Sequence, residues 1–407
     1  MERPYAKVNI TEKSERSVRA GHPWVYGEEI IESAGTFNNG DIVDVYTKKD
    51  RWLGAGYYND NSKIRVRIIS NNTNDRFDEQ FYDRRVRHAV EYRRTVMGDD
   101  FSACRLVFGE ADFFPGLTVD KFGDILVTEV LSLGMDRRRD TLYPLLVKVL
   151  AEQGVKVRAI FERNEDSLRD KEGLPKYKGF YRMDGLLEDL DGHTEICENG
   201  IFYDVDYING QKTGFFLDQK YNRLAAAKLA QGHSVLDCCT HTGAFALNAA
   251  KAGATHVTAV DISQDALNMA QKNAIRNGLE ANMRFLKADV FDLLTELVDT
   301  KNREYDYIIL DPPAFTKSGA TLRNAFKGYK EINMKAMRAL PRGGYLATCS
   351  CSHFMNRGLF EQMLAEAAAD ANVRLRQIEA RQQSADHPML WGVPETDYLK
   401  FYLFQVS

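Results

Sequence analysis

The chain has 407 residues, of which 44% are hydrophobic and 28% are charged. That length predicts two or three domains, and that composition is typical of a globular protein. A formal net charge of -4 excludes a protein that is basic overall, so any contact with nucleic acid requires local basic patches. No apolar run approaches the roughly 20 residues that span a bilayer, and the first residues contain no apolar signal-peptide core. We therefore expect a cytoplasmic protein that makes no use of a membrane.

The six cysteines predict neither a disulfide framework nor a metal site, because no Cys-x-x-Cys pair occurs among them. In a reducing compartment such residues are buried hydrophobes or take part in thiolate chemistry. They are Cys104, Cys197, Cys238, Cys239, Cys349 and Cys351.

Two small domains are predicted before residue 190. Residues 1–74 alternate apolar and polar positions between turns such as Asn39-Gly40-Asp41, which predicts a small β-barrel. Residues 75–190 predict an α+β domain, with helices near 81–94 and 136–153, strands near 104–108, 117–120, 125–130 and 157–162, and a loop at 169–179.

Residues 191–407 predict a Rossmann-like α/β domain. A hairpin with the turn Asn199-Gly200 opens it, and helix and strand patterns then alternate regularly from residue 220. Such alternation is typical of a doubly wound parallel sheet. Residues 373–378 and 398–404 predict two closing strands.

Acidic residues follow successive predicted strands of this domain. Gly243 ends the turn after the first strand, Asp261 ends the second strand, and Asp289 follows the third. Ligands bind at the carboxyl ends of such strands, where an acid can accept hydrogen bonds from a ribose diol or an adenine amino group. The glycine fingerprint of a dinucleotide site is missing, so another nucleoside cofactor is favoured. The alternative is that these acids, or Ser263, only cap helices.

Asp311-Pro312-Pro313 and the pair Cys349 and Cys351 follow the next two predicted strands. The prolines stop the strand and make a rigid rim against which a planar base could lie, with Asp311 as acceptor. A thiolate at the neighbouring strand end could attack an electron-poor ring carbon. Spacing alone does not choose between the two cysteines, and both could instead be buried hydrophobes.

Basic residues gather in two segments of the N-terminal half. They predict an RNA-binding face, with a solvated charged surface as the alternative. The residues are Lys7, Lys13, Arg16, Arg19, Arg84, Arg85, Arg87, Arg93 and Arg94, with His22, Trp24, Tyr57 and Tyr58 nearby in sequence.

The whole chain resembles the RlmI family of 23S rRNA (cytosine-C5) methyltransferases. The resemblance rests on Arg19-Ala-Gly-His-Pro-Trp-Val-Tyr, Gln211-Lys-Thr-Gly-Phe-Phe-Leu-Asp-Gln, Asp311-Pro-Pro-Ala-Phe, Lys327-Gly-Tyr-Lys-Glu-Ile-Asn, Ser350-Cys-Ser and Ala385-Asp-His-Pro. It implies an N-terminal PUA domain, a middle α+β domain and a Rossmann-like methyltransferase domain. S-adenosylmethionine is the implied cofactor and 23S rRNA, naked or early in assembly, the implied partner. A homodimer is one option for the assembly.

The resemblance also implies roles for individual residues. Cys351 is the implied nucleophile and Asp311 the residue that holds the base. The implied cofactor residues are Asp218, Gln219, Asp237, Thr242, Gly243, Asp261, Ile262, Asp289, Val290 and Asp311. The implied substrate residues are Pro312, Pro313, Phe315, Lys317 and His387. The chain departs from the family's usual pattern at Lys220 (usually Arg), at His241 (usually an aromatic residue) and at the extra thiol Cys349.

We therefore expect methylation of carbon 5 of a cytosine through a cysteine adduct. Two other readings stay open: methylation of a base nitrogen by the Asp-Pro-Pro-x-Phe motif without a cysteine, and RNA binding without catalysis. A nicotinamide oxidoreductase is disfavoured by the missing glycine fingerprint. The target nucleotide and the base that removes the carbon-5 proton are not predicted.

Overall fold

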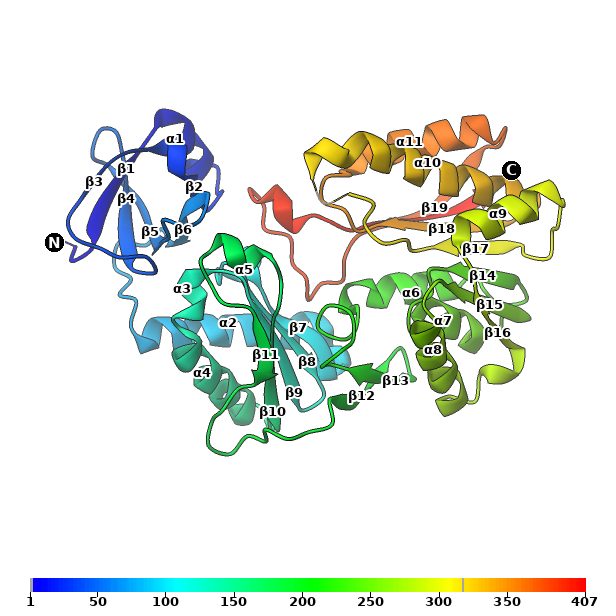
Figure 1. Cartoon of the computed structure of the whole chain (residues 1–407), viewed down its shortest axis with the longest axis horizontal. Helices are drawn as coiled ribbons and strands as arrows, with labels where there is room; N and C mark the ends of the chain where they lie inside the picture. Colours follow the sequence, from blue (N-terminus) through cyan, green and yellow to red (C-terminus); the bar gives the residue numbers. More distant parts are fainter. Residues whose placement is uncertain (1–2, 317) are drawn as a thin grey trace. The chain divides into compact units, whose positions relative to one another are not determined.

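The computed structural model describes residues 3–316 and 318–407 (Figure 1). The chain divides into two compact units. The first comprises Met1–Ile196, Val205–Leu217 and Ala385–Thr396, and the second comprises Cys197–Asp204, Asp218–Ser384 and Asp397–Ser407. The division into domains at residues 74 and 190 remains a prediction.

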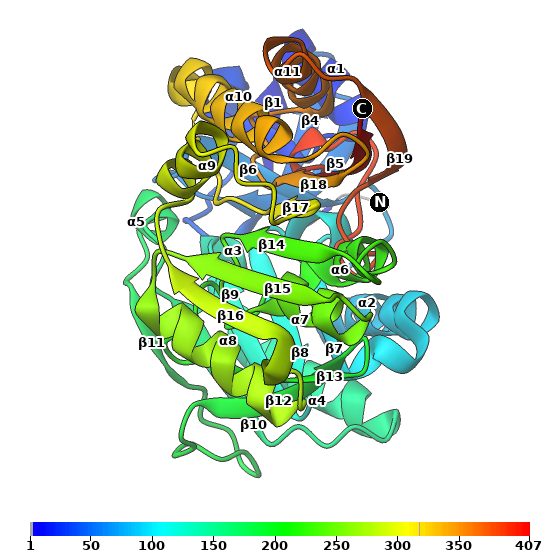
Figure 2. The same cartoon turned by 90° about the vertical axis from the view of Figure 1, so that its right-hand side faces the viewer.

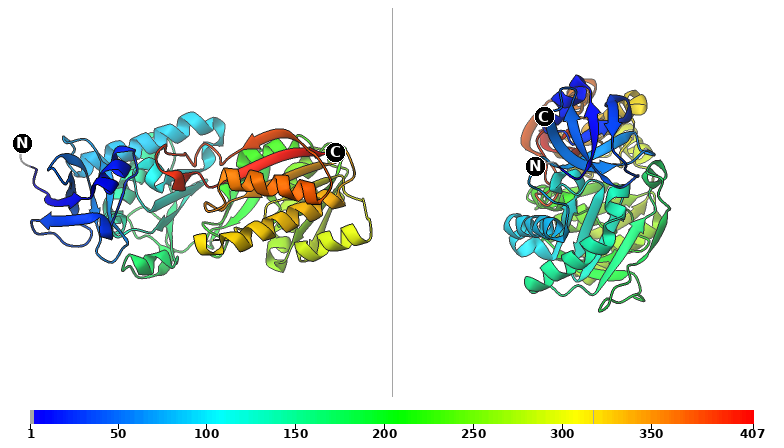
Figure 3. Two further views of the ribbon diagram at one scale, coloured as in Figure 1. Left: turned by 90° about the horizontal axis from the view of Figure 1, so that it is seen from above. Right: turned by 90° about the vertical axis from the view of Figure 1, so that its left-hand side faces the viewer.

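The first sheet of the first unit has six strands in the order β2-β6-β5-β4-β1-β3. Its strands belong to the blue, N-terminal part of the chain (Figure 3, right). One side of the sheet buries branched aliphatic residues such as Val8, Val25 and Val45, as alternating strands require. A helix, α1, interrupts the strands that the alternation predicted, because Thr11 caps it by accepting from the Ser14 amide. The elements are β1 (Ala6–Ile10), α1 (Glu12–Arg19), β2 (Trp24–Tyr26), β3 (Ile30–Ala34), β4 (Ile42–Thr47), β5 (Trp52–Tyr58) and β6 (Ile64–Ser70).

The second sheet of this unit has five strands in the order β11-β10-β9-β8-β7, with α2 beside α4 (Figure 1). The loop predicted at 169–179 was wrong, since it contains α5 and the start of β11. That edge strand forms because it pairs with β10 and because Phe180 packs 4.9 Å from Phe161. The elements are α2 (Glu79–Met97), β7 (Ala103–Phe108), β8 (Leu117–Phe122), β9 (Ile125–Val130), α3 (Leu133–Asp136), α4 (Arg139–Glu152), β10 (Ala159–Asn164), α5 (Leu168–Lys171) and β11 (Tyr177–Phe180).

A two-stranded sheet follows, formed by β12 (His193–Glu198) and β13 (Ile201–Asp206). Asn199 and Gly200 both take positive φ angles, 53° and 72°, at its turn. A turn of this kind favours Asn-Gly, because asparagine and glycine tolerate the left-handed conformation.

The second unit is built on a seven-stranded sheet in the order β16-β15-β14-β17-β18-β20-β19 (Figures 1 and 2). The first five strands are parallel, and β20 pairs antiparallel with both of its neighbours. The strands are β14 (Ser234–Cys238), β15 (His256–Asp261), β16 (Met283–Lys287), β17 (Tyr307–Leu310), β18 (Tyr345–Ser350), β19 (Leu375–Arg381) and β20 (Lys400–Val406). The predicted Rossmann-like fold is thereby confirmed.

Helices cover both faces of this sheet (Figures 1 and 2). Successive residues of a strand serve opposite cores, so Leu236 packs with α9, α10 and α11 while Val235 packs with α6 and α7. The helices are α6 (Lys220–Ala227), α7 (Ala244–Lys251), α8 (Gln264–Arg276), α9 (Val290–Asp299), α10 (Leu322–Ala339) and α11 (Arg357–Asp370).

Within residues 3–316 and 318–407, the helices are all too short or too polar to cross a bilayer.

Candidate active site

The carboxyl ends of the five parallel strands meet along one edge of the seven-stranded sheet. The register pairs Cys238 with Val260 on one side and with Leu310 on the other, and Leu310 with Thr348. The chain order reverses between β14 and β17, and ligands of doubly wound sheets bind at such a reversal. The residues that follow these strands therefore form one candidate site.

The turn after β14 is unusually tight. Cys239, His241 and Gly243 all take left-handed backbone angles, with φ of 63°, 51° and 83°. A Cβ atom at Gly243 would lie 2.9 Å from the Cβ of Ala270 on α8, so the turn requires glycine both for its angle and for this close approach. Burial lowers the pKa of His241 to about 4. This imidazole is therefore an uncharged ring at neutral pH, so the departure at His241 from the usual aromatic residue still places an uncharged ring in the turn.

Asp261 is held rigidly at the end of β15. One carboxylate oxygen accepts the amide of His241 at 2.9 Å, and the other accepts the amide of Ser263 at 2.9 Å. Each carboxylate oxygen can accept a further bond, so the group remains suited to a pair of hydroxyl donors. The next side chain, Ile262, is 67% exposed. An exposed apolar side chain beside a fixed acid suits a ligand that has both a ribose and a flat ring.

Asp289 is exposed and caps α9, since its Oδ1 accepts the Phe291 amide at 2.7 Å. Ser263, rather than Asp261, caps α8. Helix capping therefore accounts for one carboxylate oxygen of Asp289. It does not account for Asp261, which is not the cap of α8. Val290 is buried in the core beside α10 and α11.

Asp237 lies within β14 and is completely buried. Its Oδ2 accepts the Thr240 hydroxyl at 2.6 Å and the Ala246 amide at 2.9 Å, so it ties the tight turn to α7. Burial raises the pKa of Asp237 to about 7, while the bond from Thr240 opposes that rise. Thr242 Oγ1 and Asp237 Oδ1 are buried and have no hydrogen-bond partner among the residues that the structure describes.

Asp218 and Gln219 lie just before α6 and connect to Asp311. Gln219 donates from its side-chain amide to Asp311 at 3.0 Å, and Asn222 donates to the Gln219 oxygen at 2.7 Å. The Tyr398 hydroxyl donates to Asp218 at 2.7 Å. Burial and then the nearby Asp218 charge raise the pKa of Asp311 to about 6. The carboxyl group after β17 can therefore both accept and release a proton near neutral pH.

The two cysteines of the last parallel strand have different surroundings. Cys349 is inside β18, completely buried among the residues that pack against α6 and α7. Burial raises the pKa of Cys349 well above its usual value, and its thiol also interacts with Asp311. Cys351 comes after the strand has ended and is partly exposed. Burial, and then the charges of Asp311 and Asp218, raise the pKa of Cys351 to about 12, while Lys400 lowers it.

Three of the predicted substrate residues follow β17, one lies outside the described residues and one belongs to the first unit. Pro313 is exposed, Pro312 is buried, and the half-buried Phe315 ring packs 4.5 Å from Tyr329. Lys317 lies outside the described residues. His387 belongs to the first unit, where it is buried beside Asp386, 3.0 Å away, and its ring centre is 5.4 Å from that of Phe108.

Some residues of the predicted RNA-binding face are buried and cannot contact RNA. Arg93 is completely buried and pairs with Asp112, and Tyr57 is buried against the Tyr82 hydroxyl at 2.7 Å. Arg87 pairs with Asp83 at 2.6 Å and with Glu152. The basic pattern of this helix therefore includes residues that hold the first unit together.

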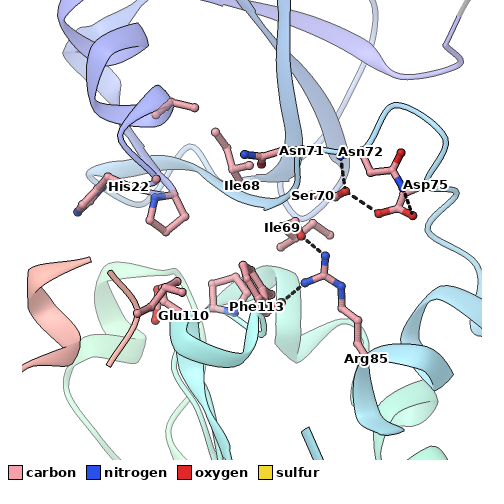
Figure 4. A pocket seen from close by; sticks show the side chains of 15 residues that line it. His22, Ile68, Ile69, Ser70, Asn71, Asn72, Asp75, Arg85, Glu110 and Phe113 are labelled. Atoms are coloured by element: carbon pink, nitrogen blue, oxygen red, sulfur yellow. Dashed lines mark hydrogen bonds between the residues drawn. The ribbon is translucent and has the colours of Figure 1, made fainter. Parts of the chain in front are cut away.

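A hollow of about 430 Å³ lies within the first unit (Figure 4). Arg85 reaches across it, donating to the carbonyl oxygens of Ile69 and Phe113. The hollow includes none of the strand-end residues, so it is separate from the candidate active site.

Two residues that contact the strand-end segments were not among the predicted site residues: Tyr398, which donates to Asp218, and Lys400, which donates to the Ser352 carbonyl. Lys400 is 1% exposed and stands in the otherwise apolar run Tyr398-Leu-Lys-Phe-Tyr-Leu-Phe. A lone charge within a predicted buried strand was the available signal.

Comparison with known proteins defines the class of this chain. Residues 177–404 match the family model described as S-adenosylmethionine-dependent methyltransferase, and residues 8–71 match the PUA-like domain model. Within the described part of the chain the Thr242 hydroxyl has no partner, and this hydroxyl, the fixed Asp261 carboxylate and the exposed Ile262 side chain could hold the amino-acid, ribose and adenine parts of that cofactor. The chain is thus an S-adenosylmethionine-dependent methyltransferase with a PUA-like domain.

Two relatives narrow the class. The chain is 39% identical over 398 residues to ribosomal RNA large subunit methyltransferase I of Aeromonas hydrophila, covering 97% of this chain and 98% of the relative. It is 40% identical over 397 residues to the protein of the same name from Shewanella denitrificans, with the same coverage. The chain belongs to the ribosomal RNA large subunit methyltransferase I family.

Solved structures agree with the fold. A Streptococcus mutans protein described as a SAM-dependent methyltransferase superposes with a TM-score of 0.81 at 21% identity, covering 98% of this chain and 99% of that chain. The structure of SMU.776 complexed with SAH superposes with a TM-score of 0.83 at 21% identity and the same coverage.

Proposed function

We propose that this chain methylates carbon 5 of a cytosine in 23S rRNA through a covalent bond to Cys351. The observation that carries the proposal is the placement of Asp311 and Cys351 directly after β17 and β18, two paired parallel strands. The relatives' name supports ribosomal RNA of the large subunit as the substrate. The PUA-like match supports an RNA contact in residues 8–71.

The surroundings of the two thiols favour Cys351 as the nucleophile. A nucleophile must reach a base that enters from solvent, and Cys349 is sealed within the sheet while Cys351 is partly exposed. The Cys349 thiol instead interacts with the carboxyl group of Asp311.

The proposed chemistry needs a flipped-out cytosine, because an enzyme cannot reach carbon 6 of a base that is stacked within an RNA helix. The Cys351 thiolate adds to carbon 6, which makes carbon 5 nucleophilic. S-adenosylmethionine, when bound, would supply the methyl group that carbon 5 takes, and its sulfur would keep the electron pair of the broken sulfur–methyl bond. A base then removes the carbon-5 proton, the electrons of that bond restore the ring double bond, and the thiolate leaves.

Asp311 acts on the other edge of the ring. A carboxyl group with its pKa raised to about 6 is partly protonated near neutral pH, so it can donate a proton toward the ring nitrogen. A protonated ring is the better acceptor for the thiolate. Pro312 and Pro313 fix the backbone beside it.

Methylation of a base nitrogen is the second candidate, supported by the Asp311-Pro-Pro-Ala-Phe315 run. That reaction uses the lone pair of an amino group and needs no thiol. The two candidates therefore differ in their dependence on Cys351.

The test is transfer of a labelled methyl group to naked 23S rRNA, followed by identification of the modified nucleoside. We expect 5-methylcytosine with the wild type, no transfer with Cys351→Ala, and retained transfer with Cys349→Ala. Calorimetry should show that Cys351→Ala still binds S-adenosylmethionine. Full activity of Cys351→Ala, or a methyl group on nitrogen, would contradict the proposal.

A further inference from the structure

Lys400 is bound to the chain on both sides of Cys351. Its backbone pairs with Ser350 in the antiparallel ladder of β18 and β20. Its Nζ donates to the carbonyl oxygen of Ser352 at 2.6 Å and to that of Tyr398 at 2.7 Å. Ser352 is itself buried and donates to the Thr316 carbonyl at 3.1 Å. The segment 350–352 is therefore held at both ends by one lysine.

A buried lysine at this position is costly to keep. Removing an ammonium group from water carries a large desolvation penalty, and an apolar side chain of similar length would avoid it. Two carbonyl oxygens offset only part of that penalty. The position thus calls for an explanation beyond packing.

We propose that Lys400 is a positioning residue that holds the Cys351 segment in place and whose positive charge favours the thiolate form of Cys351. The proposal rests on the proposed function in one respect, that Cys351 is the nucleophile. It adds a residue that neither the sequence motifs nor the cofactor site includes.

The charges around Cys351 show why a cation is needed there. Asp311 and Asp218 both raise the pKa of the thiol, and Lys400 lowers it. Burial in turn lowers the pKa of Lys400 to about 8, Asp397 and Cys351 act to raise it, and Arg357 lowers it further. Lys400 is therefore mostly protonated at neutral pH. The negative charges of Asp311 and Asp218 would otherwise oppose ionisation of this thiol.

The first test is the pH dependence of Cys351 alkylation by iodoacetamide, resolved by peptide mass spectrometry in the full-length chain. Lys400→Gln keeps a hydrogen-bond donor for the two carbonyls but removes the charge. We expect it to slow alkylation about tenfold at a given pH, equivalent to about one unit in the thiol pKa. Lys400→Arg should recover most of the wild-type rate because it keeps the charge.

The matched control is Lys121→Gln. Lys121 is also buried and donates to a backbone carbonyl, that of Ser102 at 3.1 Å, but it belongs to the first unit. It should leave Cys351 alkylation unchanged. An unchanged Lys400→Gln profile would overturn the proposal, and so would a Lys400→Arg profile as slow as that of Lys400→Gln.

Methyl transfer then separates this inference from the proposed function. Lys400→Gln should lower kcat at least tenfold with little change in KM for RNA, and part of the loss should be recovered at higher pH. A wild type that transfers no methyl group to RNA contradicts the proposed function. Even if the wild type transfers no methyl group, the alkylation profiles decide whether Lys400 favours ionisation of the Cys351 thiol.

Discussion

The guanidinium of Arg223 on α6 lies 2.6 Å from the carboxylate of Glu198 on β12, and both side chains are almost completely buried. This ion pair fastens the end of the β12–β13 hairpin to the helix that follows Asp218 and Gln219. Breaking a buried pair leaves one charge without compensation, whereas replacing both members removes that penalty.

We expect Glu198→Leu to destabilise the second unit by about 3–5 kcal/mol, and the double variant Glu198→Leu/Arg223→Leu to lose much less. The measurement is hydrogen exchange of β14, because Trp24, Trp52 and Trp391 all belong to the first unit and their fluorescence would not report on the second. If the double variant lost as much free energy of unfolding as the two single variants together, this interpretation of the ion pair would be contradicted.

Gly243→Ala should destabilise the second unit by more than its backbone angle alone explains. A non-glycine residue at φ of 83° costs about 1–3 kcal/mol, and the collision with Ala270 adds about 1–3 kcal/mol. Gly232→Ala is the matched control, since Gly232 has φ of 78° but no atom within 4 Å of an added Cβ. Equal effects on β14 hydrogen exchange would show that the close approach to α8 has no cost.

Asp261→Asn should weaken S-adenosylmethionine binding about 10- to 100-fold in calorimetry. An amide has one acceptor oxygen, so it cannot accept both the His241 and Ser263 amides and also serve hydroxyl donors. The loss of hydrogen bonds to a charged group corresponds to about 1.5–3 kcal/mol. Asp265→Asn, an exposed acid four residues further on, should bind the cofactor normally. Unchanged affinity of Asp261→Asn would remove Asp261 from the cofactor site.

The stability of the second unit should fall as pH rises from about 4 to 7. Asp237 ionises near its usual pKa of about 4 in the unfolded chain but keeps its proton to about 7 when folded, so the unfolded chain holds fewer protons in this range. Asp311, with its pKa raised to about 6, acts in the same direction.

We therefore expect Asp237→Asn to reduce the stability difference between pH 5 and pH 8 by about 3 kcal/mol at most. The measurement is β14 hydrogen exchange at both pH values, corrected for the intrinsic exchange rate. Asp184→Asn, an exposed acid of the first unit, should retain the wild-type difference. If Asp237→Asn and the wild type lost the same stability between pH 5 and pH 8, the raised pKa assigned to the buried Asp237 would be contradicted.

Most of the second unit could be predicted from local patterns. The alternation of apolar strands with helices, and the strict placement of Gly243, Asp261, Asp289 and Asp311 after those strands, are properties of neighbouring residues. Parallel strands align their carboxyl ends, so these patterns were enough to predict a common edge. The helix α1 and the edge strand β11 were missed, because a cap and a pairing partner decided them rather than propensity.

The sequence by itself determined the class of fold, the family and the set of residues at the strand ends, because repeating apolar patterns and turn residues specify these locally. Only the tertiary structure decided how those residues are supported. It sealed Cys349 inside the sheet while leaving Cys351 at its edge, it brought Gln219 against Asp311, and it placed Lys400 beside the segment of Cys351. Burial and the charge of a neighbour depend on which distant residues pack together, and these set the properties of each thiol and carboxylate.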